Sequence, residues 1–216
     1  METLIKNIAR ELNQTQDSLD KMDGEVKQRA FDRLPIKMQH MLDELWGQLY
    51  SDKGRKNIPQ SDGCWSGEAG NSIWMPNRDC VPPNKGYSNM HLKTWGRILD
   101  ENHIESIRFI DGRADFSPIT DIAITQDWEL LIGNEGLMNL CNTGNREQLH
   151  EAAFEQMRIL RGYSDIQEAR AYKEKRNLVW HEEPDCHTLR LIPREVHDNI
   201  KHFGGIAMLQ IVIKNI

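Results

Sequence analysis

Four side chains near the C-terminus are of the types that hold a hydrolytic metal ion. His181 and Glu182 are adjacent at the end of a run that alternates between apolar and polar residues, and His197 and His202 follow later in the chain. A metal that hydrolyses phosphodiesters needs few protein ligands, a base that deprotonates water and open positions for the phosphate. Imidazoles and carboxylates are competent ligands for Mg²⁺, Mn²⁺, Zn²⁺ or Ni²⁺, depending on geometry. We therefore expect these four groups to converge on one divalent ion.

Residues 177–205 predict a strand, a second strand and a short helix, which is the order of a ββα-metal core. Residues 177–181 and 187–192 alternate in polarity and predict a hairpin, because the residues between them favour a turn. Pro193 suits the first helical position, and residues 194–201 can form about two helical turns.

The spacing of the two later histidines constrains this helix. His197 and His202 are five residues apart, which places them about 140° apart around an ideal helix. Both can face one ion only if the helix is already ending at His202, and the following Gly204-Gly205 pair permits such a bend. His187, in the second predicted strand, is an alternative ligand.

The rest of the chain predicts an α+β fold in three parts. Residues 1–55 have helical periodicity, and residues 57–128 show short apolar runs, tryptophans and prolines typical of short strands with long loops. Residues 129–216 combine helices with the ββα core at 177–205. Within these parts we expect a short amphipathic helix over 93–102, and two helices over 147–176 that break near Gly162.

The composition sets limits on what the protein does. The chain has 216 residues, 38% of them hydrophobic and 28% charged, and contains no apolar run long enough to span a membrane. The N-terminus lacks the apolar core of a signal peptide. The four cysteines are scattered without a Cys-x-x-Cys pair, which argues against a structural zinc site and indicates reduced thiols in a cytoplasmic setting.

The net charge is unfavourable for an enzyme that acts on nucleic acid. Its value is −6, and phosphate binding normally depends on basic residues. The excess of acidic residues lies before residue 151, because residues 151–216 contain 10 Lys or Arg and 10 Asp or Glu. A neutral region can still present a basic face beside a metal.

Several ordered segments resemble one family. The chain is similar to the HNH/endonuclease VII superfamily, specifically to bacterial polymorphic-toxin nucleases with a Trp-His-His or Trp-His-Glu signature. The C-terminal segments that carry the resemblance are Trp180-His181-Glu182, Leu191-Ile192-Pro193, Glu195-Val196-His197 and His202-Phe203-Gly204-Gly205.

The resemblance extends upstream and covers about residues 57–207. It includes the segments Trp65-Ser66-Gly67-Glu68, Gly70-Asn71-Ser72, Pro82-Pro83, Lys93-Thr94-Trp95 and Asp115-Phe116-Ser117-Pro118. Two features depart from the family pattern. Phe203 stands where a small polar residue or Leu is usual, and the residues after Ile206 run past the usual end.

The resemblance implies roles for individual residues. His181 and Glu182 would supply the base and one metal ligand, with His181 favoured as the base because imidazole titrates near neutrality. Glu182 would then be a ligand or an orienting carboxylate. His197 and His202 would lie at the metal or the phosphate. Two arginines, Arg190 and Arg194, could hold the scissile phosphate, and Trp180 would anchor the hairpin.

The resemblance also implies a function. The protein would be a metal-dependent endonuclease that hydrolyses DNA, acting as an antibacterial toxin that a cognate immunity protein neutralises. It would be cytoplasmic in the producer and would reach the cytoplasm of target bacteria through a secretion apparatus or adaptor, without a classical signal peptide. Two alternatives stay open: a ribonuclease with the same centre, and a non-catalytic binding protein with a degenerate nuclease fold.

Overall fold

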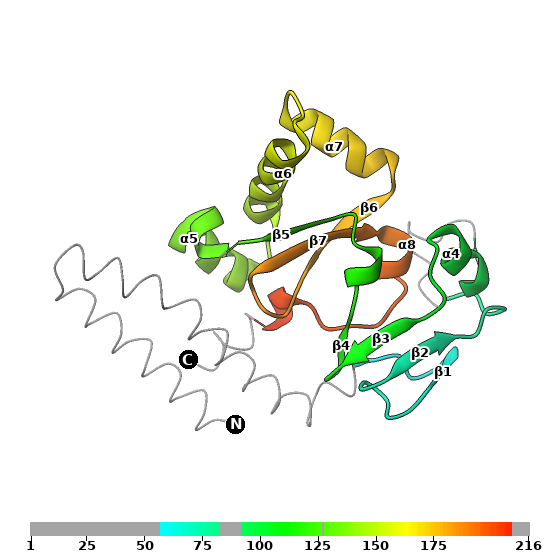
Figure 1. Ribbon diagram of the computed structural model, residues 1–216. Coiled ribbons are helices and arrows are strands. Elements are labelled where there is room, and N and C mark those ends of the chain that lie inside the picture. Colours follow the sequence, from blue (N-terminus) through cyan, green and yellow to red (C-terminus); the bar gives the residue numbers. More distant parts are fainter. Residues whose placement is uncertain (1–56, 83–91, 127, 209–216) are drawn as a thin grey trace, which may run out of the picture.

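The computed structural model describes residues 57–82, 92–126 and 128–208 (Figure 1). Within these ranges helices and small antiparallel sheets are mixed, so the predicted α+β fold is confirmed. The helices predicted for residues 1–55 lie outside the described residues, and so does the end of the C-terminal tail. None of the helices in the described part is long and apolar enough to cross a membrane.

A four-stranded antiparallel sheet comes first in the chain. Its order is β1-β2-β3-β4, and its strands are β1 (Gly63–Trp65), β2 (Ile73–Pro76), β3 (Ile107–Ile110) and β4 (Arg113–Ala114). All the strands are short, as the sequence predicts for this region.

A short helix, α4 (Trp95–Glu101), lies beside this sheet (Figure 1). Its N-cap is Thr94, whose hydroxyl accepts a hydrogen bond from the backbone of Arg97. Ile98 and Leu99 are fully buried, so the amphipathic helix predicted over residues 93–102 is confirmed.

The second sheet contains three antiparallel strands in the order β5-β7-β6. The central strand, β7 (Thr188–Pro193), pairs with β6 (Leu178–Glu182) as the predicted hairpin and with β5 (Ile122–Thr125) on its other edge. In the β6–β7 register His181 lies opposite Arg190, and Leu178 lies opposite Pro193. The hairpin is thus supported by a strand from earlier in the chain.

Three helices cover one face of this sheet (Figure 1). They are α5 (Trp128–Thr143), α6 (Glu147–Arg161) and α7 (Ile166–Lys175). The predicted break near Gly162 is confirmed: this glycine ends α6 in the left-handed conformation, at φ 68°, and Asp165 caps the start of α7. The helix α5, whose helical geometry is interrupted at Gly133, was not among the predicted elements.

The two faces of the second sheet contribute to different cores. Leu178, Trp180, Leu189 and Leu191 pack against the helices α5–α7. Ile192 and the partly buried Val179 pack on the other side, in a core shared with the first sheet, α4 and α8 (Arg194–His197). Because side chains alternate along a strand, each strand of the hairpin supplies both cores.

The final helix of the ββα core is shorter than predicted. The expected helix over residues 194–201 ends at His197, and Pro193 is its N-cap and not its first residue. The carbonyl of Glu195 accepts a hydrogen bond from the side-chain amide of Asn199, whose own backbone N–H bonds to Val196. A side chain that takes the carbonyl of a helix in this way competes with the next backbone bond.

Two neighbouring glycines after His202 differ in how closely their backbone packs against the rest of the protein. A Cβ atom on Gly205 would lie 2.3 Å from the carbonyl oxygen of Glu183 and 2.7 Å from Trp128, whereas one on Gly204 would meet only the Glu182 carbonyl, at 3.6 Å. We expect Gly205→Ala to lower the free energy of unfolding by about 1–3 kcal/mol through overpacking. Gly204→Ala, the matched control, should change it by less than about 1 kcal/mol. Urea unfolding of both variants checks this, and equal effects would contradict it.

Candidate metal centre

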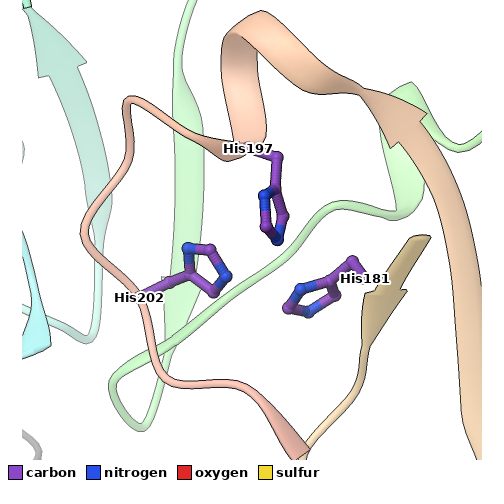
Figure 2. Close-up of side chains that lie close together, drawn as sticks. All are labelled: His181, His197 and His202. Atoms are coloured by element: carbon purple, nitrogen blue, oxygen red, sulfur yellow. The ribbon is translucent and has the colours of Figure 1, made fainter. Parts of the chain in front are cut away.

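Three imidazoles converge at the end of the β6–β7 hairpin. His181 comes from β6, His197 from the last residue of α8, and His202 from the loop that follows (Figure 2). Each offers one ring nitrogen, and these nitrogens all lie within 4.8 Å of one another. Nitrogens bound to one tetrahedral ion at about 2.1 Å are about 3.4 Å apart, so small ring rotations would complete such a site.

The early end of α8 produces this convergence. After His197 the chain leaves the helix, and Val196 and Ile200 are held in the core shared with α4. The backbone then carries His202 round to face the other two rings, with ring centroids 4.6 Å from His197 and 4.9 Å from His181. The prediction that both histidines face one point because the helix ends between them is therefore confirmed.

Hydrogen bonds orient two of the rings. His197 Nδ1 lies 2.8 Å from a carboxylate oxygen of Asp198, and His202 Nδ1 lies 2.8 Å from the carbonyl oxygen of Ile200. Because both partners accept, each Nδ1 donates, which leaves Nε2 of each ring as the nitrogen that could bind a metal. Second bonds of this kind fix the orientation and tautomer of metal-binding histidines.

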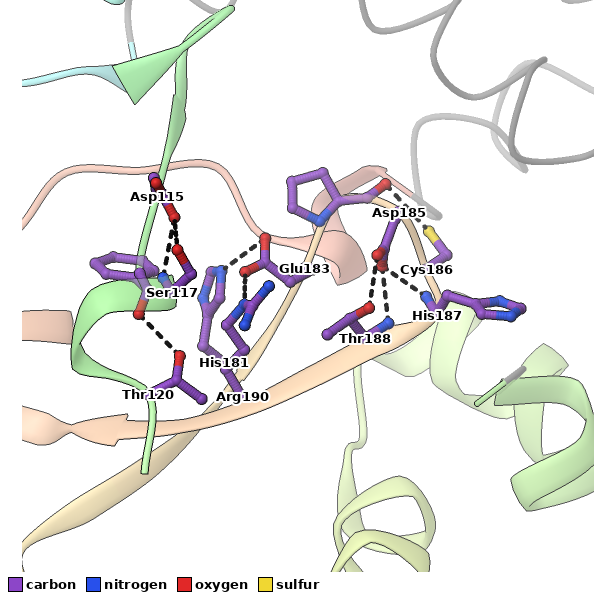
Figure 3. A network of polar contacts seen from close by, with 12 residues as sticks. Asp115, Ser117, Thr120, His181, Glu183, Asp185, Cys186, His187, Thr188 and Arg190 are labelled. Atoms are coloured by element: carbon purple, nitrogen blue, oxygen red, sulfur yellow. Dashed lines mark hydrogen bonds and ion pairs between the residues drawn. The ribbon is translucent and has the colours of Figure 1, made fainter. Parts of the chain in front are cut away.

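The third ring lies near a carboxylate for which no role was predicted. His181 is buried, and its Nε2 lies 3.8 Å from Glu183, which also accepts a hydrogen bond of 2.6 Å from Nε of Arg190 (Figure 3). Burial alone would raise the pKa of Glu183, but the nearby His181 and the hydrogen bond and positive charge of Arg190 outweigh it and lower the pKa. Glu183 is therefore an ionised partner of His181. Its position two residues after His181, just past the end of β6, was the available signal, because alternate residues of an extended chain point to the same face.

Glu182 is not part of the imidazole cluster, and the geometry corrects its predicted role as a shared ligand. Its carboxylate lies 2.9 Å from Nε2 of His150, on α6, and 3.1 Å from Nε of Arg146. Burial alone would raise the pKa of Glu182, but the bond and charge of His150 and the charge of Arg146 lower it. Adjacent residues of a strand point to opposite faces, so Glu182 faces the helices while His181 faces the cluster.

The two predicted phosphate-binding arginines lie in different places. Arg190 is opposite His181 in the hairpin and bonds to Glu183, so it borders the cluster. Arg194 donates to the carbonyl of Leu178, at the other end of β6. His187 is at the hairpin turn, where its backbone N–H bonds to Asp185, and its ring points away from His181 in Figure 3. The alternative ligand is thus not part of the cluster.

Phe116 forms one wall of the cluster. Its ring is fully buried, and its centroid lies 4.8 Å from that of His181, 5.2 Å from His202 and 6.2 Å from His197. The segment around Phe116 carries part of the family resemblance, but no role was predicted for this residue. An apolar wall of this kind limits the access of water to one side of the rings.

The donor set fits a transition metal. Burial lowers the pKa of His202 well below its usual value, and the positive charges of His197 and His181 lower it further. This ring is therefore neutral near pH 7 and has a free lone pair. Three imidazoles suit Zn²⁺ or Ni²⁺, whereas Mg²⁺ prefers oxygen ligands.

Comparison with known proteins agrees with this chemistry. Residues 110–204 match the family model of the DNase/tRNase domain of colicin-like bacteriocin. The matched region contains all three imidazoles, and it is therefore similar to the nuclease domain of a toxin. Residues 57–109, which contain β1, β2 and α4, lie outside it. No curated protein and no solved structure matches the chain.

The first prediction from this geometry concerns metal affinity. His197→Ala and His202→Ala should each weaken the binding of one Zn²⁺ or Ni²⁺ by more than about 100-fold, because even partners of metal ligands contribute 10- to 100-fold. His187→Ala, the matched control, should bind as the wild type does. Isothermal titration of the metal-free proteins measures this. Unchanged affinity in both cluster variants would show that the imidazoles do not hold a metal.

The second prediction concerns the stability of the metal-free protein. The pKa of His202 is lowered in the folded state. At a pH just below 6.5, the ordinary pKa of histidine, the unfolded chain therefore binds more protons than the folded protein does. Stability is therefore lost as the pH falls below about 6.5, by up to about 1.4 kcal/mol per pH unit.

Urea unfolding in EDTA at pH 7.5 and 5.5 checks this loss of stability. His202→Asn should reduce the difference between the two values, whereas His103→Asn, at an exposed position, should not. An equal pH effect in His202→Asn and the wild type would contradict the assignment.

Proposed function

We propose that this protein is a metal-dependent endonuclease that hydrolyses DNA and acts as an antibacterial toxin. The observation that carries the proposal is the convergence of His181, His197 and His202 within a region similar to nuclease toxin domains. A degenerate binding protein has no need to keep three imidazoles aimed at one point, two of them held by hydrogen bonds that leave Nε2 free.

His197 and His202 would hold the ion, and His181 would be the third ligand. A catalytic zinc site usually has three protein ligands and one open position. When bound, the metal would lower the pKa of a water molecule towards neutrality and stabilise charge on the phosphate. Glu183 would keep the ring of His181 in place, and Phe116 would exclude water from one side.

The alternative role of His181 is that of the general base. Its contact with Glu183 would then stabilise the imidazolium that forms as the ring takes a proton from the attacking water. The two roles have different consequences for His181→Ala: loss of a ligand weakens metal binding, whereas loss of a base leaves the affinity intact and lowers only the rate. Titration of this variant decides between them.

Arg190 is the better candidate for the scissile phosphate. Its Nε bonds to Glu183, and the remaining N–H groups of its guanidinium could contact a phosphate that lies at the metal. Arg194 is further along the hairpin and would contact the flanking backbone at most. Contacts to the backbone carry no sequence information, so we propose cleavage with little sequence preference.

The biological setting follows from the likeness to bacteriocin nuclease domains. The producer would need a cognate immunity protein, because a nuclease made in its cytoplasm would cut its own DNA. A secretion apparatus or adaptor would deliver the protein to the cytoplasm of target bacteria. The matched family includes both DNases and tRNases, so a ribonuclease with the same centre is the second candidate.

Incubation with plasmid, linear DNA and total RNA tests this proposal. With Zn²⁺, Ni²⁺, Mn²⁺ or Mg²⁺ the wild type should degrade both DNA substrates, and EDTA should abolish the activity. His202→Ala should cut at least about 100-fold more slowly at unchanged circular dichroism, whereas His187→Ala should cut normally. Degradation of RNA alone would exclude the DNase, and full activity of His202→Ala would exclude the metal mechanism.

A further inference from the structure

The helix α8, which ends at His197, is connected to another layer of the protein by a lysine. Lys93 precedes Thr94, the N-cap of α4, and its ammonium group forms an ion pair with Oε1 of Glu195, the second residue of α8. The two residues are 102 positions apart in the chain, but their helices lie side by side (Figure 1). The ion pair therefore links α8 to α4.

This ion pair is largely shielded from solvent. The side chains of Lys93 and Glu195 are 13% and 15% exposed, so their charges are screened less than those of a surface pair. A second carboxylate, that of Glu101 at the end of α4, lies 2.6 Å from the same ammonium group. Burial alone would lower the pKa of Lys93, but its hydrogen bonds with Glu101 and Glu195 and their negative charges raise it. Lys93 is therefore charged near pH 7.

The place of Glu195 on α8 makes this contact relevant to His197. Residues two apart on an ideal helix are separated by about 200°, so Glu195 and His197 project from nearly opposite sides of α8. Lys93 contacts the helix on one side, and His197 joins the imidazole cluster on the other. A rotation of α8 about its axis would therefore break the ion pair and turn His197 away from the other two rings at the same time.

Contacts with neighbouring elements have to set the rotation of α8, because a helix of four residues is not stable on its own. At its start the backbone N–H of Arg194 donates to the carbonyl of Asn177, and Val196 is buried in the core that includes α4. The ion pair with Lys93 adds a contact on the side opposite His197.

We propose that Lys93 is a positioning residue of the metal centre, because through Glu195 it sets the orientation of α8 and thereby the direction of the His197 ring. The inference rests on the proposed function, since it takes the three imidazoles to bind one metal ion. It places a determinant of metal affinity at residue 93, outside the region 110–204 that matches the nuclease toxin domain.

Titration of the metal-free protein with Zn²⁺ tests the proposal without depending on catalysis. Lys93→Met should weaken the binding of Zn²⁺ about 2- to 30-fold, the range expected for a residue that acts on a site through others. Lys93→Arg, which keeps the charge, should restore most of the affinity. Arg97→Met is the matched control and should bind as the wild type does, because Arg97 is exposed and pairs with Glu101. Unchanged affinity in Lys93→Met would overturn the proposal.

A second control separates positioning from a general loss of stability. Arg161 on α6 forms a partly buried ion pair with Asp121, which precedes β5. Arg161→Met should lower the urea midpoint of unfolding, as Lys93→Met does, but should leave the affinity for Zn²⁺ unchanged. An equal loss of affinity in both variants would show that stability alone explains the effect, and would overturn the proposal.

A double-mutant cycle tests whether Lys93 acts through Glu195. If it does, Lys93→Met combined with Glu195→Gln should bind Zn²⁺ about as weakly as Lys93→Met alone, because the second change removes a group that has already lost its partner. Losses that add in the double variant would overturn the proposed route.

The ring of His197 gives a signal that needs no metal. Its Nδ1–H is bonded to Asp198, and its NMR signal is assigned through His197→Ala. In the metal-free protein this signal should shift in Lys93→Met but not in Arg97→Met or Arg161→Met, and an unchanged signal in Lys93→Met would overturn the proposal.

The same titrations separate this inference from the proposed function. If the wild type binds no Zn²⁺, the metal centre of the proposed function fails, and the role of Lys93 in it fails as well. If the wild type binds Zn²⁺ and Lys93→Met binds it equally well, only the positioning role fails.

Discussion

The alternation of side chains along β6 is the constraint on which the candidate site depends. This strand is covered on both faces, so each of its residues has to serve one core or the other. Trp180 and Glu182 face the helices, while His181 and Glu183 face the cluster. A shift of one residue in the register would exchange these pairs and remove His181 from the site. The pairing of β7 with both β5 and β6 stabilises the register.

The position of His197 depends on the first sheet and α4 as well as on the hairpin. Val196 and Ile200 are buried in the same core as Trp95 and Ile98, and Lys93 forms an ion pair with Glu195 on α8. The helix α8 has only four residues and would not be stable alone. The strands β1 and β2 and the helix α4, which lie outside the matched region, are therefore part of the layer that holds His197 in place.

Electrostatics divide the two carboxylates of the hairpin between different tasks. Glu183 lies between His181 and Arg190, close to the cluster, and Glu182 lies between His150 and Arg146 on the opposite face. Both stay ionised because their basic partners outweigh the effect of burial. The unfavourable net charge of the chain thus says little about the site, where local pairing decides the charge of each group.

Much of the site followed from the sequence, because the relevant signals are local. The hairpin, the identity of the three histidines and the need for the helix to end before His202 all come from spacing and turn residues within residues 177–205. The helices on either side of Gly162 were equally visible, because a left-handed glycine and a capping aspartate are short-range signals.

The tertiary structure decided what depends on residues far apart in the chain. The strand β5 pairs with the hairpin although three helices separate them in the chain. Phe116 packs on histidine rings that are more than sixty positions away in the sequence. Which of Glu182 and Glu183 lies near the imidazole cluster depends on the partners on each face of the hairpin. His150 of α6 pairs with Glu182 on one face, and Arg190 pairs with Glu183 on the other. A sequence shows which groups are able to bind a metal, but only the packing of both faces shows which of them point to the same place.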